Sequence, residues 1–322
     1  MLNETAFAGA NQSRWSRLAD LVNRAEASLK TLPSQDLMEL IRLYRQASAD
    51  LALLRTDQAN PRLTADLNAL VARAHSVIYR RPMKRVGEAI KVALFAAADT
   101  TRRRKVFIFA SILIFFISCA FNWTVLATRP DLRPEIIPPA SEELFSHWKE
   151  GKFDERDFDQ DSMMTAFYMS NNPFVAIRMA TVSAATFGVG TVESLHQNGT
   201  VMGALAYEMN SVGKLGFLIG SIYPHGASEL NGMFMAGAAG LLMGYSLLCP
   251  GRRTRGQALR EGGKDAMVMA CQAVVMMFIA APFEGYFSFN PAVPQPLKWV
   301  VGTIVLAAWL AFWSFYGKGR TE

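Results

Sequence analysis

The stretch VFIFASILIFFISCAFNWTVLAT, residues 106–128, contains 23 residues and no charged side chain. A helix rises about 1.5 Å per residue, so a stretch of this length crosses the apolar core of a bilayer, which is about 30 Å thick. The uncharged runs at 230–251, 266–283 and 299–317 are comparable. The sequence therefore predicts an all-α membrane protein whose helices form a bundle and cross the bilayer several times.

Composition separates this membrane part from the N-terminal part. Of the 322 residues, 51% are hydrophobic and 19% are charged, and residues 1–105 are the charged, helix-prone part. There, apolar residues recur at helical spacing in three segments, which is typical of amphipathic helices that bury one another. We expect a small cytoplasmic helical bundle with its connector over residues 1–100 and a membrane domain over 101–322. The connector, 82–100, has the basic amphipathic pattern of a helix on a membrane surface, and it fits a helix packed on the bundle equally well.

The charge pattern predicts an orientation. The formal net charge of +6 does not indicate nucleic-acid binding, because the basic residues cluster beside the apolar runs, at 102–105, 252–264 and 318–320. The segment 129–165 has five basic and ten acidic residues instead. By the positive-inside rule, the basic clusters are cytoplasmic and the acidic segment is external. We therefore expect a multi-pass protein of the bacterial inner (cytoplasmic) membrane, with both termini cytoplasmic and no signal peptide.

The external loop, at about 129–170, has two interpretations. Its second half either forms a helix that packs Leu144, Phe145 and Trp148 on the membrane domain, or it is a long solvated loop.

Charged residues divide the segment 173–229 into short pieces. Fourteen uncharged residues separate Arg178 from Glu193, and the same number separates Glu193 from Glu208 and Lys214 from Glu229. Such lengths are short for a span and typical of buried, interrupted or re-entrant segments. The orientation requires an even number of crossings here, most simply through 173–194 and 200–222. The sequence thus predicts about six spans, with a turn at 196–199 near the inner side.

Polar residues at membrane depth are the candidates for function, because each must face protein, water or a partner. His225 and Glu229 lie four residues apart, on one face of a helix that Pro224 would begin. In one interpretation Glu229 complements the helix dipole and His225 caps neighbouring carbonyls. In the other, the two form an acid/base or binding pair at the outer mouth of a polar cavity. The predicted cavity residues are Asn171, Asn172, Arg178, Glu193, Glu208, His225 and Glu229, and further polar residues at this depth are His196, Asn210, Lys214 and Glu284.

Recognised enzyme and metal motifs are absent from the sequence. It offers one His-x3-Glu and scattered carboxylates, whereas a zinc site usually needs three or four protein ligands. It has no nucleophile elbow, phosphate loop or dinucleotide loop. We therefore expect no catalytic residue, no metal and no cofactor.

Small residues form a stripe in the run at 230–251. Gly232, Ala236, Gly240 and Gly244 recur every four residues, which lets the backbone of another helix approach closely. We expect these glycines to pack helices together.

The membrane part resembles the stage II sporulation protein M family, also called DUF95, over roughly residues 101–322. The resemblance lies in NNP at 171–173, FGVGT at 187–191, NG at 198–199 followed by Gly203, and PHGASE at 224–229. The N-terminal domain is similar to the extension of longer members, which are associated with MoxR-type ATPases. The sporulation member is understood as a membrane scaffold for peptidoglycan hydrolases.

The resemblance therefore implies a non-enzymatic scaffold or assembly protein of the envelope. Its expected partners are membrane lipid, other envelope proteins, a MoxR-type ATPase system and further copies of itself, with no nucleic acid. Two alternatives stay open: a transporter or lipid-handling protein, and an intramembrane hydrolase that uses His225 and Glu229.

Overall fold

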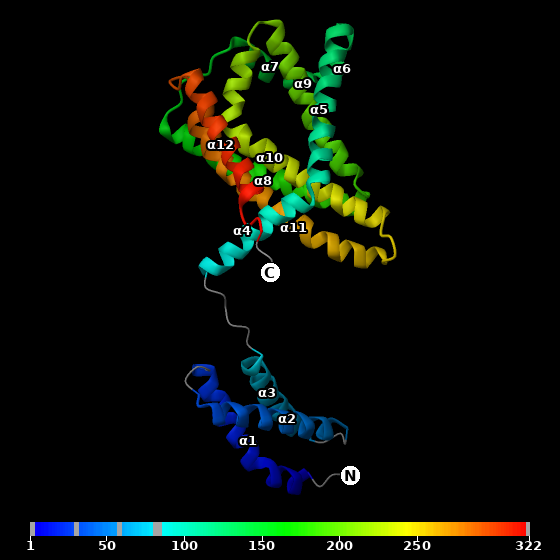
Figure 1. Cartoon of the computed structure of the whole chain (residues 1–322), viewed down its shortest axis with the longest axis vertical. Helices are drawn as coiled ribbons and strands as arrows, with labels where there is room; N and C mark the ends of the chain where they lie inside the picture. Colours follow the sequence, from blue (N-terminus) through cyan, green and yellow to red (C-terminus); the bar gives the residue numbers. More distant parts are fainter. Residues whose placement is uncertain (1–3, 29–31, 57–59, 80–85, 320–322) are drawn as a thin grey trace. The chain divides into compact units, whose positions relative to one another are not determined.

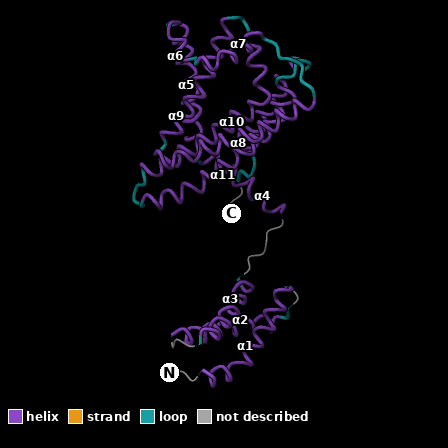
Figure 2. Tube along the Cα trace, turned by 180° about the vertical axis from the view of Figure 1, so that it is seen from behind, coloured by secondary structure: helices purple, strands orange, loops and turns teal. Residues whose placement is uncertain are grey.

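The computed structural model describes residues 4–28, 32–56, 60–79 and 86–319, which are helical almost throughout and include no β-strand (Figures 1 and 2). This confirms the predicted all-α class. The chain divides into two compact units, Met1–Arg85 and Val86–Glu322.

The first unit has its own hydrophobic core. It contains α1 (Glu4–Ala27), α2 (Ser34–Thr56) and α3 (Pro61–Ile78), each with an apolar stripe turned toward the other two. Leu18, Leu40 and Leu54 are fully buried between them. One buried polar contact joins two helices, because Trp15 Nε1 donates to Asp50 Oδ2 over 3.0 Å.

The helix α4 (Val86–Arg103) covers most of the predicted connector and belongs to the second unit; residues 82–85 lie outside the described part of the chain. It contacts α11 and α12. Arg103 and the following Arg104 both pair with Asp265 of α11, at 3.0 and 2.7 Å. The basic residues before the first apolar run are thus fixed to another helix of the same unit.

Within the described residues, four helices are long and apolar enough to cross a membrane. They are α5 (Lys105–Thr128), α10 (Leu215–Leu248), α11 (Arg255–Pro282) extended by the π-helical turn η4 (Phe283–Ser288), and α12 (Gln295–Phe315). Two further long helices, α8 (Phe158–Thr186) and α9 (Val189–Ser211), are too polar to be counted with them. The helix α10 lies at the centre of the unit and contacts α5, α8, α9, α11 and α12.

The predicted turn at 196–199 is wrong, because these residues lie inside α9. The glycines there serve close packing instead. A Cβ atom at Gly199 would lie 2.5 Å from the carbonyl oxygen of Phe115, and one at Gly203 would lie 2.7 Å from Cys119 Cα. The chain reverses at Phe187 and Gly188, which both have left-handed backbone angles, φ 53° and 97°.

The predicted helix start at Pro224 is also wrong. The helix α10 runs without a break from Leu215 to Leu248, with Pro224 in its interior. Proline costs a helix one backbone hydrogen bond, and neighbouring helices compensate for this loss in packed membrane bundles. His225 and Glu229 therefore lie far from a helix end, which removes the basis for pairing Glu229 with a helix dipole.

The small residues of α10 lie at its closest helix contacts. A Cβ atom at Gly232 would lie 3.2 Å from the carbonyl oxygen of Ala273, and one at Gly240 would lie 2.9 Å from that of Met179. At Gly244 the added atom would lie 2.6 Å from Gly188 Cα. These three glycines bring α10 against α11, α8 and the turn between α8 and α9.

The segment between α5 and α8 is folded. It contains two 3₁₀ turns, η2 (Pro130–Leu132) and η3 (Pro139–Ser141), and the helices α6 (Arg133–Ile136) and α7 (Glu142–Glu150). Of the three apolar residues expected to pack, Phe145 and Trp148 are buried against α9 and α10, whereas Leu144 is 53% exposed. The helical interpretation of this segment is the one the structure shows.

Candidate functional site

A cluster of one histidine and two glutamates lies in the membrane unit. One potential ligand atom from each of His225, Glu229 and Glu284 lies within 4.8 Å of the other two. His225 and Glu229 come from α10, where their spacing of four residues places them on one face. Glu284 comes from η4, more than fifty residues later, so the cluster joins two segments that are distant in sequence.

The position of Glu284 depends on the π-helical turn that ends α11. Single π turns inside or at the end of α-helices shift side chains off the regular face and are frequent at functional sites. The next residue, Gly285, packs tightly on α8, since a Cβ atom there would lie 3.0 Å from the carbonyl oxygen of Asp161. The turn is therefore held on one side by α8 while it presents Glu284 to α10.

A second layer of polar side chains orients the cluster. His225 Nδ1 lies 2.8 Å from Ser288 Oγ, and the backbone carbonyl of Ser288 accepts a hydrogen bond from Lys298 Nζ at 2.7 Å. Asn172 Nδ2 donates to Glu284 Oε2 at 3.2 Å. Asn171 donates in turn to Asn172 Oδ1 at 3.1 Å. The imidazole and one carboxylate are thus fixed by partners from η4 and α8.

The negative charges of the two carboxyl groups are not balanced by a paired cation in the described part of the chain. Glu229 and Glu284 lie within hydrogen-bonding reach of each other. In the described part of the chain, neither forms a salt bridge with a lysine or arginine; the nearby Arg156 pairs with Asp161 at 3.1 Å and donates to the Gly285 carbonyl. Two carboxylates in a site of low polarity need a shared proton or a cation. The cluster can therefore bind a positive ion or hold a proton.

A pocket of about 480 Å³ extends to this cluster. Its wall includes Trp148 of α7, Arg156 and Tyr168, and Glu284 is part of its lining. Because α7 belongs to the segment expected to be external, the pocket connects Glu284 to that side of the unit.

The predicted cavity residues do not all meet here. Asn171, Asn172, His225 and Glu229 belong to the site or its second layer. Arg178 and Glu193 are exposed on α8 and α9, where Glu193 accepts a hydrogen bond from Gln197. Glu208 is buried elsewhere, between Arg133 and Lys149. The structure thus separates Arg178, Glu193 and Glu208 from the cluster.

Glu284 is named from the sequence among the polar residues at membrane depth, but not among the predicted cavity residues. The sequence signal was present, since it is an acidic residue directly after the uncharged run 266–283. Spacing within one helix reveals a pair such as His225 and Glu229, but it does not show which distant carboxylate completes it.

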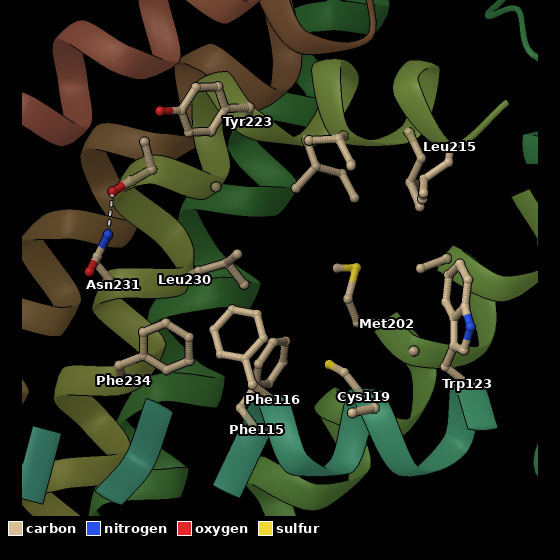
Figure 3. A pocket seen from close by; sticks show the side chains of 18 of the residues that line it. Phe115, Phe116, Cys119, Trp123, Met202, Leu215, Tyr223, Leu230, Asn231 and Phe234 are labelled. Carbon is tan, nitrogen blue, oxygen red and sulfur yellow. Dashed lines mark hydrogen bonds between the residues drawn. The ribbon is translucent and has the colours of Figure 1, made fainter. Parts of the chain in front are cut away.

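A second cavity, of about 670 Å³, is almost entirely apolar. It lies between α5, α9 and α10, and Figure 3 shows Phe116, Met202 and Leu230 pointing into it. The side-chain amide of Asn231, which lines it, donates to the Ala227 carbonyl at 2.9 Å.

Two family models match separate parts of the chain. The family model for stage II sporulation protein M matches residues 111–289, more than half of the sequence, from α5 to the residue after η4. The chain belongs to the stage II sporulation protein M family. The match includes every residue of the cluster and confirms the resemblance read from the sequence. In this family member, residues 5–80 match a separate domain of unknown function, DUF8413. No curated protein and no solved structure matches the chain.

Proposed function

We propose that this membrane protein is a scaffold of the bacterial cell envelope. In this proposal it lies in the inner membrane with both termini cytoplasmic, and it links a cytoplasmic partner to envelope proteins on the outer side. Its family membership supports the proposal, and so does its division into a helical bundle with its own core and a membrane unit. The observation that carries it is the folded segment 129–157, which offers a rigid surface.

Ion pairs fix this segment to the membrane unit. Glu208 of α9 accepts a hydrogen bond from Arg133 Nε at 2.8 Å and pairs with Lys149 of α7. Arg133 also binds Glu142 at 3.0 Å. Lys214 Nζ, from the turn before α10, donates to the carbonyl of Lys149 at 2.8 Å. A surface held in this way loses little entropy when a partner binds, which favours a docking role.

The order of the helices supports six crossings. If α5 leaves the cytoplasm, then α8, α9, α10, α11 and α12 alternate in direction and return the C-terminus to the cytoplasm. The basic clusters at 102–105, 252–264 and 318–320 then all lie on the inner side, as the positive-inside rule requires.

Site-specific photo-cross-linking in the native host tests the scaffold proposal. A photo-reactive residue replaces Leu144 on α7 or Met38 on α2, which are 53% and 68% exposed. We expect each probe to capture a defined protein, and both captured proteins to occur in one complex. A probe at Phe121 of α5, 62% exposed on an apolar helix, is the matched control for contact with lipid. Cross-linking at both sites that does not exceed the control contradicts the proposal.

The apolar cavity supports a second candidate function, lipid handling. A cavity of this volume with almost no polar lining suits an acyl chain rather than a polar substrate. Native mass spectrometry of the protein released from nanodiscs measures bound lipid. Ala206 lines the cavity, so Ala206→Trp should reduce lipid retention, whereas Phe121→Trp on an exposed position should not. Equal retention by both variants contradicts this function.

A further inference from the structure

We infer that His225, Glu229 and Glu284 form a binding site for one divalent transition-metal ion, for which Zn²⁺ is the natural probe. The site goes beyond the scaffold function, which does not require it. It joins the middle of α10 to the π-helical turn η4.

Charge balance is the first argument. A carboxylate oxygen of Glu229 lies within 4.8 Å of one of Glu284, and no lysine or arginine of the described chain forms a salt bridge with either residue. A divalent cation neutralises both charges at once. This removes the repulsion between them and the cost of burying them.

Ligand chemistry selects the kind of metal. Ca²⁺ and Mg²⁺ prefer sites made only of oxygen atoms, whereas an imidazole nitrogen with carboxylate oxygens suits Zn²⁺ and its transition-metal neighbours. Three protein ligands leave a fourth position for water, as in zinc sites with an open coordination position. One ligand atom from each residue lies within 4.8 Å of the other two, so the three side chains are close enough to share one ion.

The second layer has the arrangement of a metal site. Histidine ligands usually donate their other ring N–H to a neighbouring acceptor, which fixes the ring and its tautomer. Ser288 Oγ, 2.8 Å from His225 Nδ1, can be that acceptor, and this leaves the Nε2 lone pair for the metal. Glu284 is held by Asn172 in the same way. Within the described residues, the structure gives His225 no other hydrogen bond.

An entry path exists as well. The pocket of about 480 Å³ that begins at α7 has Glu284 in its lining and includes Asp154 and Glu155 along its wall. Acidic side chains attract cations toward such an opening. The pocket thus leads from α7 to Glu284, one of the three proposed ligands.

Metal binding by the full-length protein in nanodiscs tests the inference. The protein carries no polyhistidine tag and is stripped with a chelator before titration with Zn²⁺. We expect one Zn²⁺ per chain at micromolar concentration or below, and an affinity at least tenfold lower in Glu284→Gln and in His225→Ala. The control variants Glu193→Gln and His196→Ala change exposed residues of the same types on α9 and should bind like the wild type.

Spectroscopy with Co²⁺ separates binding at the cluster from binding elsewhere. Co²⁺ in a site of low coordination number absorbs visible light strongly, so the wild type should give this band and Glu284→Gln should not. Glu229→Gln and Glu284→Gln keep the size of the side chain, which keeps the test valid if His225→Ala fails to fold. The inference is overturned if the wild type binds neither ion, or if the cluster variants bind both as tightly as the controls.

Discussion

At the residue scale, the environment of each charged side chain decides whether it belongs to a site. Glu208 is buried with two cations beside it, whereas Glu193 is exposed and bound only to Gln197. Glu229 and Glu284 differ from both, because they lie close to each other and neither forms a salt bridge with a lysine or arginine in the described part of the chain; Glu284 has only the amide of Asn172 as a hydrogen-bond donor. The first arrangement stabilises the structure and the last requires a ligand or a proton.

Glu208→Gln tests the structural role. The substitution keeps the size of the side chain but removes the negative charge between Arg133 and Lys149, which are each about one-third exposed. Since hydrogen bonds to charged groups contribute about 1.5–3 kcal/mol and solvent screens part of this, we expect the free energy of unfolding to fall by about 1–2 kcal/mol. Thermal unfolding in detergent measures the loss. Glu193→Gln should change it by less than about 0.5 kcal/mol, and equal effects of the two variants contradict the assignment.

The same ion pairs make the external segment sensitive to acid. The hydrogen bond from Arg133 lowers the pKa of Glu142 below its ordinary value of 4.5. A depressed pKa in the folded state gives stability that is fully present above pH 4.5 and is lost as the pH falls through the lower value. Proteolysis within 129–157 should therefore increase below pH 4.5. Glu142→Gln should be cut more readily at neutral pH and show a weaker pH dependence; an unchanged profile contradicts the role of Glu142.

At the element scale, the sequence predicts what composition determines and fails where packing decides. The apolar run at 106–128 becomes α5 almost residue for residue. Asn198-Gly199 and Pro224 have the local chemistry of a turn and of a helix start, yet both lie inside helices. In a packed bundle, the close approach of α5 at Gly199 and the packing of the surrounding helices on α10 outweigh these local preferences. The pair His225 and Glu229 follows from helical spacing, whereas Glu284 joins it only through the contact of α10 with η4.

Gly244→Ala tests the packing of α10. An added Cβ atom would lie 2.6 Å from Gly188 Cα, and Gly188 has a left-handed backbone that cannot easily move. Overpacking costs about 1–3 kcal/mol, so we expect the melting temperature in detergent to fall. Gly216→Ala is the matched control, because it lies near the start of the same helix with nothing within 4 Å of the added atom. Alanine there should be neutral or slightly stabilising. Equal melting temperatures of Gly244→Ala and wild type would show that the contact is looser than the structure indicates.

At the scale of the whole molecule, the two units have the properties of different environments. The core of the first consists mainly of leucines and alanines on amphipathic helices, as in water-soluble bundles. In the second unit, only 22% of the residues in the most apolar stretch of α5 are buried, and only 17% in that of α12. Both helices are nevertheless rich in large apolar side chains. Apolar helices with so little protein cover need lipid or another protein around them. Family, composition and packing thus agree on a membrane protein, in which the first unit buries its apolar residues within itself and the second leaves many of its own exposed.

The number of crossings depends on α8 and α9, and one labelling position decides it. If both helices cross the membrane, the turn at 187–188 between them lies in the cytoplasm; if neither does, the turn lies outside with α7. Val189, 69% exposed just after this turn, is therefore the informative site for a single cysteine in a chain without Cys119, Cys249 and Cys271.

A reagent that does not cross the membrane should label Ser141→Cys in intact cells and should not label Thr254→Cys, because these positions lie on opposite sides in either arrangement. We expect Val189→Cys to react only after permeabilisation, since six crossings also place the basic clusters inside. Labelling of Val189→Cys in intact cells would reduce the protein to four crossings, with α8 and α9 as an external hairpin.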